Sequence, residues 1–107
     1  MDGRVQQSVT EFARCHFAVE WVDMVTEAGA VVDVHANLLR QVGISLDAHQ
    51  SCGVVVAAHE GCVGNPVGDE KQRQQCLAAA QKVAAAYPET QVVAVWVGLD
   101  GNVETIS

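Results

Sequence analysis

The stretch that decides the fold is Gly-Val-Val-Val-Ala-Ala-His, residues 53–59. A continuous run of small and β-branched residues is typical of a strand that is covered on both faces. A second run, Val-Val-Ala-Val-Trp-Val at 92–97, predicts another buried strand. Because strands of this kind occur in parallel sheets flanked by helices, the sequence predicts an α/β fold.

Helical patterns lie before and between these predicted strands. Apolar residues recur at helical spacing over residues 5–16, 34–50 and 69–87. Asp69 is placed to cap the third of these helices, with Gln72 as its partner in a capping box. Each helix therefore has an apolar face that can cover the predicted sheet.

Two further strands are predicted at 20–26 (EWVDMVT) and 103–106, the latter after a tight turn. Helices thus alternate with strands that right-handed crossovers would join in parallel. A doubly wound sheet normally begins with its central strand, yet no strand precedes Val5. We therefore expect a doubly wound, mainly parallel sheet whose N-terminal central strand is missing from this chain.

Length and charge restrict the possible functions. The chain has 107 residues, which predicts a single domain over 1–107, and half of the residues are apolar. The net charge of −7 disfavours nucleic acid and anionic membrane surfaces as partners, because both require a basic face. No apolar run approaches the roughly 20 residues of a membrane span, and no signal-peptide core follows the first residues. A cytoplasmic location is expected, with the four cysteines reduced.

The sequence His59-Glu60-Gly61-Cys62 follows the first buried strand. In doubly wound sheets, ligands bind beyond the carboxyl ends of the strands. A His-x-x-Cys turn at that edge can place an imidazole nitrogen and a thiolate around one Zn²⁺ ion. The spacing alone leaves open the alternative that both side chains simply pack within the turn.

The remaining histidines and cysteines are interpreted as structural. His49 and Cys52 repeat the His-x-x-Cys spacing, but seven strand residues place them about 20 Å from His59, at the opposite edge. His49 is expected to end a helix or pack, and Cys52 to be a small buried residue. Cys76 lies on the apolar face of its helix, and His35 is expected to face solvent near a helix start.

Residues 54–67 resemble the β-class carbonic anhydrases, and most closely a short branch in which Gly-Asn-Pro follows His-x-x-Cys. Met1-Asp2-Gly3-Arg4 is similar to the end of the family's Cys-x-Asp-x-Arg motif, whose Cys and preceding strand would lie before Met1. The resemblance implies a three-layer doubly wound fold in which that strand lies between 20–26 and 53–59. A chain that begins at Met1 must pair those two strands directly or borrow a strand from a partner.

The resemblance also implies a chemistry. Zinc would be held by the motif's Cys together with His59 and Cys62, and hydroxide on the zinc would hydrate CO₂ reversibly to bicarbonate. Asp2 would orient that hydroxide or itself bind zinc, and Arg4 would pair with Asp2. Without the Cys, the three remaining ligands Asp2, His59 and Cys62 imply weaker zinc binding and poor activity. Glu27 stands in a loop where fuller members carry Arg, so CS₂ and carbonyl sulfide remain alternative substrates.

Other functions remain open beside this carbonate dehydratase-type lyase. One is a non-catalytic domain that retains the fold for metal binding or assembly, with Asp2 and Arg4 part of a solvated terminus. A more remote one is a thiol hydrolase with Cys62 as its nucleophile. The resemblance also implies a homodimer or a larger homo-oligomer, to which the alanine-rich helix at 78–86 would contribute an apolar face.

Overall fold

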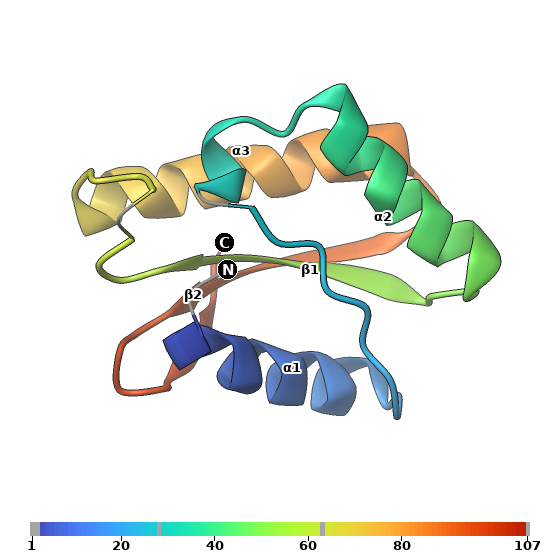
Figure 1. Ribbon diagram of the computed structural model, residues 1–107, viewed down its shortest axis with the longest axis horizontal. Coiled ribbons are helices and arrows are strands. Elements are labelled where there is room, and N and C mark those ends of the chain that lie inside the picture. The colour runs from blue at the N-terminus through green and yellow to red at the C-terminus, as the bar shows by residue number, and fades with distance from the viewer. Residues whose placement is uncertain (1–2, 28, 63, 107) are drawn as a thin grey trace.

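The computed structural model describes residues 3–27, 29–62 and 64–106. The helices are α1 (Gly3–Phe17), the short 3₁₀ helix η1 (Ala30–Val32), α2 (Ala36–Ala48) and α3 (Asp69–Ala86), and the strands are β1 (Gly53–His59), β2 (Gln91–Val97) and β3 (Val103–Thr105). These elements form a mixed α/β structure, as predicted, with helices on both sides of a small sheet (Figure 1).

The sheet has the order β1-β2-β3. β1 and β2 run parallel, in a register that pairs Gly53 with Gln91 and His59 with Val97. β3 pairs antiparallel with β2, and Val97 faces Val103. The two buried valine runs therefore form the predicted parallel pair, and the sheet as a whole is mixed. β1 forms one edge of this sheet.

Helix α1 covers one face of the sheet (Figure 1). Val5 and Val9 of this helix pack with Val95 and Val97 of β2, and both strand residues are fully buried. The alternate residues of β1, Val55 and Ala57, pack at the edge of the same cluster. Residues four apart on α1 therefore pack against residues two apart on β2, as the sequence pattern predicts.

Helices α2 and α3 cover the opposite face (Figure 1). Two clusters of buried residues form this part of the core: Val34, Leu38, Val42, Ala79 and Val83 in one, and Ala58, Cys76, Ala80, Ala94 and Trp96 in the other. Small alanines on α3 allow this helix to lie close to the strands, since their side chains occupy little volume.

The predicted strand at 20–26 is wrong. Residues 21–27 carry no regular structure, and the side chain of Trp21 is 83% exposed. The segment passes from the end of α1 towards η1, across the direction of β1 rather than along it (Figure 1). A ladder of backbone hydrogen bonds requires two segments that run side by side, so the high β-propensity of these residues is not realised.

The predicted capping box at the start of α3 is also wrong. Gly68 occupies the cap position, its backbone accepts a hydrogen bond from the N–H of Gln72, and Asp69 is the first helical residue. The Gln72 side chain is buried and donates to the carbonyl of Asn65 at 3.4 Å. Gln72 is therefore used to hold the preceding loop against the helix.

Two further predictions about single residues are corrected. Cys52 is exposed because it precedes β1 and lies outside the layers that the helices cover. His35 is half-buried rather than solvated: its Nδ1 accepts from the N–H of Leu38 at the start of α2, and its Nε2 lies 2.9 Å from Glu27. His49, in contrast, caps the end of α2, which confirms the prediction of a helix-end residue.

Cys76 is expected to resist alkylation in the native protein, whereas Cys15 and Cys52 react. Cys76 is fully buried and donates to the carbonyl of Val56, and burial raises the pKa of its thiol to about 11. Because the thiolate is the reactive form, both accessibility and ionisation protect it. Mass spectrometry after iodoacetamide treatment, with and without denaturant, measures this. Labelling of native Cys76 at the rate of Cys52 would contradict the described packing.

Candidate functional site

The predicted His-x-x-Cys turn begins where β1 ends. The N–H of Glu60 donates to the carbonyl of Val97 at 3.0 Å, which continues the pairing with β2 one residue beyond His59. Gly61 then adopts a left-handed conformation with φ of +69°, where glycine is favoured because it lacks a Cβ atom. Cys62 follows in a half-buried position. The turn therefore lies at the carboxyl edge of the parallel strands, as predicted.

The ring of His59 is oriented by the backbone. Its Nδ1 lies 2.9 Å from the carbonyl oxygen of Glu60. A carbonyl oxygen can only accept, so Nδ1 carries a proton and donates in this contact. Metal-binding histidines commonly donate their second ring nitrogen to a carbonyl in this way. The orientation therefore suits a histidine that binds metal through Nε2.

Glu60 is directed to the neighbouring loop. Its Oε1 accepts a hydrogen bond from the N–H of Leu99 at 3.1 Å, in the connection between β2 and β3. This contact ties the His-x-x-Cys turn to the end of β2. Glu60 therefore has a structural role between two loops at the carboxyl edge.

The Gly-Asn-Pro loop is held against α3 by Asn65, whose side chain is 5% exposed. The N–H of Asn65 donates to the carbonyl of Cys62 at 3.3 Å, and its Nδ2 donates to Gln75 at 2.6 Å. Together with the bond from Gln72, these contacts fix the chain that follows Cys62. Asn65 thus shapes the loop.

A second loop approaches the same place. Gly29 has a φ of +64°, and a Cβ atom built on it would lie 2.5 Å from the carbonyl oxygen of Gly64. The backbone near Gly29 therefore contacts the Gly-Asn-Pro loop directly. This close approach depends on glycine at position 29, both for its conformation and for the space.

The other predicted site residues are only partly placed. Asp2 lies outside the described residues, and Arg4 contributes its backbone to the first turn of α1 while its side chain is also outside them. Val5, near the start of α1, and His59, at the end of β1, both line one cavity. The predicted proximity of Asp2 to the His-x-x-Cys turn stays a prediction, because Asp2 lies outside the described residues.

The donor types present suit zinc, but the described residues do not complete a site. Within residues 3–27, 29–62 and 64–106, no three His, Cys, Asp or Glu residues gather as a metal would require. His59 and Cys62 offer a nitrogen and a sulfur, which are the ligands zinc prefers. A zinc site therefore needs at least one further ligand, for which the resemblance implies the motif's Cys or Asp2, and Asp2 lies outside the described residues.

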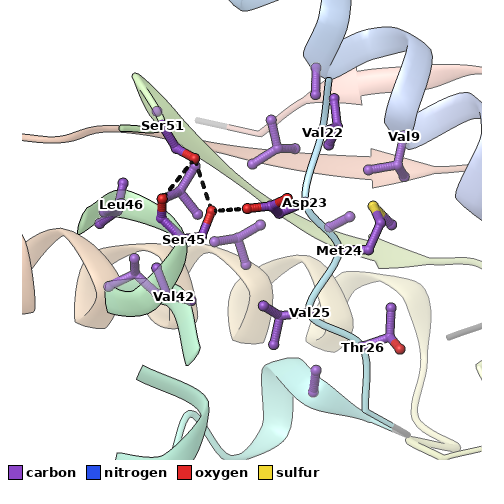
Figure 2. A pocket seen from close by; sticks show the side chains of 18 of the residues that line it. Val9, Val22, Asp23, Met24, Val25, Thr26, Val42, Ser45, Leu46 and Ser51 are labelled. Carbon is purple, nitrogen blue, oxygen red and sulfur yellow. Dashed lines mark hydrogen bonds between the residues drawn. The ribbon is translucent and has the colours of Figure 1, made fainter. Parts of the chain in front are cut away.

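The cavity that Val5 and His59 line has a volume of about 800 Å³. It lies between β1, α1, α2 and the extended segment 19–27 (Figure 2). Its lining is mainly apolar, with Val9 on one side and Val42 and Leu46 on the other (Figure 2). The cavity occupies the side of β1 that is away from β2.

Polar residues meet at one wall of this cavity. Asp23 accepts a hydrogen bond from Ser45 at 2.6 Å, and Ser45 lies 2.9 Å from Ser51 (Figure 2). Asp23 also accepts from His49 at 2.5 Å. The sequence analysis did not identify this cluster, because Asp23 and His49 are 26 residues apart. The contacts tie the extended segment to the end of α2.

Asp23→Asn is expected to lower stability near neutral pH and to have little effect in acid. The hydrogen bonds from Ser45 and then His49 hold the pKa of Asp23 below its ordinary value of 3.8. Asp23 therefore stabilises the fold above that value, and the contribution disappears as the pH falls through its lowered pKa. Urea unfolding across this pH range measures the effect. The same change at exposed Asp47 is the control, and equal pH profiles for the two variants would contradict the prediction.

A comparison with family models gives one match, to a family described as "Putative carbonic anhydrase", over residues 1–107. The chain belongs to this family. The resemblance seen in the sequence is thereby confirmed at the level of the family. No curated protein matches the chain, and no solved structure matches it.

The family match spans every residue predicted for the site, from Asp2 to Cys62. Membership in a carbonic anhydrase family is consistent with an α/β protein that carries a His-x-x-Cys turn at a sheet edge. In the part of the chain that the structure describes, no helix combines the length and apolar character needed to cross a membrane.

Proposed function

We propose that this protein is a carbonic-anhydrase-like zinc protein that hydrates CO₂ reversibly to bicarbonate, in the cytoplasm. The observation that carries the proposal is the family match over residues 1–107. The contact between His59 Nδ1 and the Glu60 carbonyl supports it, because metal-binding histidines commonly donate one ring nitrogen to a carbonyl. The finer fold assigned to this protein is the three-layer, doubly wound sheet of the β-class enzymes.

The proposed roles of the site residues in zinc binding and catalysis are as follows. His59 and Cys62 hold the metal from the turn after β1, and Asp2 is the third ligand or the acceptor that orients the attacking oxygen. Arg4 pairs with Asp2 and keeps its carboxylate ionised. When bound, zinc supplies a water molecule acidic enough to ionise near neutral pH. Gly61, with its left-handed backbone, and Asn65, which donates to the Cys62 carbonyl, hold the turn that carries Cys62.

A non-catalytic metal-binding or assembly domain is the second candidate. It is favoured by one observation: the described residues supply only His59 and Cys62, and no cluster of three metal ligands is found among them. A site with two firm ligands binds zinc weakly and holds a water molecule in no fixed position. A chain with such a site would retain the fold of its family and would not catalyse CO₂ hydration.

Zinc content and CO₂ hydration, measured on the same purified sample, separate the two candidates. About one zinc per chain, together with hydration that dipicolinate abolishes and added zinc restores, supports the proposed enzyme. Zinc without turnover of CO₂, CS₂ or carbonyl sulfide favours the non-catalytic domain. Turnover of CS₂ or carbonyl sulfide without turnover of CO₂ would replace CO₂ as the proposed substrate and would leave the proposed zinc-dependent hydration unchanged. A chain that neither binds zinc nor turns over a substrate contradicts both.

A homodimer is part of the proposal, since the family resemblance implies one. The alanine-rich helix was expected to contribute an apolar face, but Ala79, Ala80 and Val83 of α3 are buried within their own chain. Ala78, Ala85 and Ala86 of the same helix are exposed, so these residues are the part of α3 that can contact another copy. Light scattering at micromolar concentration tests this, and a monomer would contradict it.

A further inference from the structure

Glu60, the second residue of the His-x-x-Cys turn, is bound through its N–H, its carbonyl and its side chain. The N–H donates to the carbonyl of Val97 at 3.0 Å, and the carbonyl accepts from Nδ1 of His59 at 2.9 Å. The side chain accepts from the N–H of Leu99 at 3.1 Å through Oε1. This residue therefore connects the ring of His59 both to the end of β2 and to the connection that follows β2.

The connection between β2 and β3 has a conformation that its own hydrogen bonds fix. The N–H of Gly98 donates to the carbonyl of Asn102 at 3.0 Å. Asp100 accepts from the backbone N–H of Asn102 at 3.0 Å and from its Nδ2 at 2.9 Å. Because the loop is closed in this way, the N–H of Leu99 is held in a defined position for the side chain of Glu60.

The His-x-x-Cys turn contains a glycine that makes contacts from outside the turn important. Gly61 follows Glu60 with a φ of +69°, and glycine has more backbone freedom than any other residue. A rotation at this position would move the carbonyl that His59 contacts. The Leu99 side chain also borders Gly61, since its Cδ1 lies 3.7 Å from the position that a Cβ atom would take. The β2–β3 connection therefore supports two consecutive residues of the turn.

The two candidate zinc ligands depend on different supports. The carbonyl of Cys62 accepts from the N–H of Asn65, in the loop that is bonded to α3. The ring of His59 depends on Glu60, and through Glu60 on the β2–β3 connection, which lies at the same end of the sheet (Figure 1). A metal site requires its donors to keep a fixed orientation, so the loss of either support would lower its affinity.

We propose that Glu60 is a positioning residue, which fixes the ring of His59 by binding the N–H of Leu99. Glu60 would act through the backbone of the turn and not as a metal ligand. The property that matters is its acceptor oxygen rather than its charge, because a carboxamide oxygen can also accept from a backbone N–H. The relation to zinc rests on the proposed function, whereas the effect on the His59 ring does not.

Nuclear magnetic resonance of the metal-free full chain tests the positioning directly, at a pH at which histidine rings are neutral. Glu60→Ala should accelerate amide exchange at Leu99 by about 3- to 10-fold, because that N–H loses its acceptor. The nitrogen chemical shifts of the His59 ring should show a smaller share of the form protonated at Nδ1. Glu60→Gln should leave both measurements unchanged. Glu89→Ala, at another exposed glutamate, is the control and should also change neither.

Zinc affinity and the spectrum of the cobalt-loaded protein extend the test to the metal. Glu60→Ala should weaken zinc binding by about 3- to 10-fold, because it removes a support of the group that orients the ligand. Glu60→Gln should retain the wild-type affinity. The visible absorption of bound Co²⁺ depends on ligand geometry, so it should change in the alanine variant and not in the glutamine variant. A residue that only stabilised the fold would leave this spectrum unchanged.

Asp100→Ala tests the same connection without altering the turn. It removes the two hydrogen bonds from Asn102, so the loop that presents Leu99 is no longer closed by them. It should reproduce the effects of Glu60→Ala on His59 in weaker form. Because both substitutions act through one contact, the fold-loss of zinc affinity in the double variant should be smaller than the product of the two single losses. Circular dichroism and urea unfolding check that each variant retains the fold.

Several results would overturn the proposal. Unchanged exchange at Leu99 and an unchanged His59 ring in Glu60→Ala would show that the contact does not position the ring. Equal losses in Glu60→Ala and Glu60→Gln would assign the effect to the negative charge. Losses that multiply in the double variant would show that Asp100 and Glu60 act separately. A wild-type chain that binds no zinc but shows the expected metal-free effects supports the positioning of His59 and contradicts the proposed function instead.

Discussion

Cys62→Ser is expected to lower zinc affinity by about 100-fold or more and to abolish CO₂ hydration, while leaving the fold intact. Serine removes the thiolate, which is a strong zinc ligand, and supplies a hydroxyl that stays protonated at neutral pH. Cys62 is only half-buried, so the substitution costs little packing. Competition with a fluorescent zinc chelator measures the affinity, and stopped-flow pH change measures the hydration.

The chain contains its own matched control for this experiment. Cys52 follows His49 at the same spacing as Cys62 follows His59, but at the opposite end of β1. Cys52→Ser should therefore leave zinc affinity and hydration unchanged. Equal losses in the two serine variants would show that the thiols act through stability or non-specific binding. Retention of full affinity in Cys62→Ser would exclude the proposed ligand.

Gly29→Ala is expected to destabilise the protein by roughly 2–4 kcal/mol. The left-handed backbone at position 29 is strained for alanine, and the new Cβ atom would lie 2.5 Å from the carbonyl oxygen of Gly64. Relief requires a shift of backbone on either side, which also displaces the loop that follows Cys62. Urea unfolding should show the loss of stability, and zinc affinity should fall with it.

Gly3→Ala is the control for this substitution. A Cβ atom at Gly3 meets nothing within 4 Å, and alanine is the better helix former at the start of α1. Its stability should change by less than about 1 kcal/mol, in the stabilising direction. Similar losses at positions 3 and 29 would show that the contact between Gly29 and Gly64 is not what the substitution disturbs.

Much of the fold could be predicted because the relevant signals are local. The valine run at 53–59 predicted β1 with its observed bounds, and helical spacing predicted α1 and α3 to within a few residues. The His-x-x-Cys turn was predicted at the carboxyl edge and is found there. In each case, apolar periodicity and one or two glycines are sufficient, since the residues involved are close in sequence.

The failures share a different cause. Residues 20–26 have the composition of a strand but cross the direction of β1, and Cys52, which precedes β1, is exposed. The cluster of Asp23, Ser45 and His49 joins segments far apart in sequence, so no local residue spacing predicts it. Pairing and long-range contacts depend on which segments become neighbours, and the pattern of one segment does not contain that information.

The sequence by itself determined the parallel valine strands, the helices that cover them, the acidic surface and the His-Cys pair that ends β1. Only the tertiary structure decided that residues 20–26 pair with no strand in the described part of the chain, that β1 lies at an edge of the sheet formed by those residues, and that a cavity of about 800 Å³ lies beside it. The reason is physical: side-chain periodicity is a property of one segment, whereas strand partners and cavities arise from the packing of several.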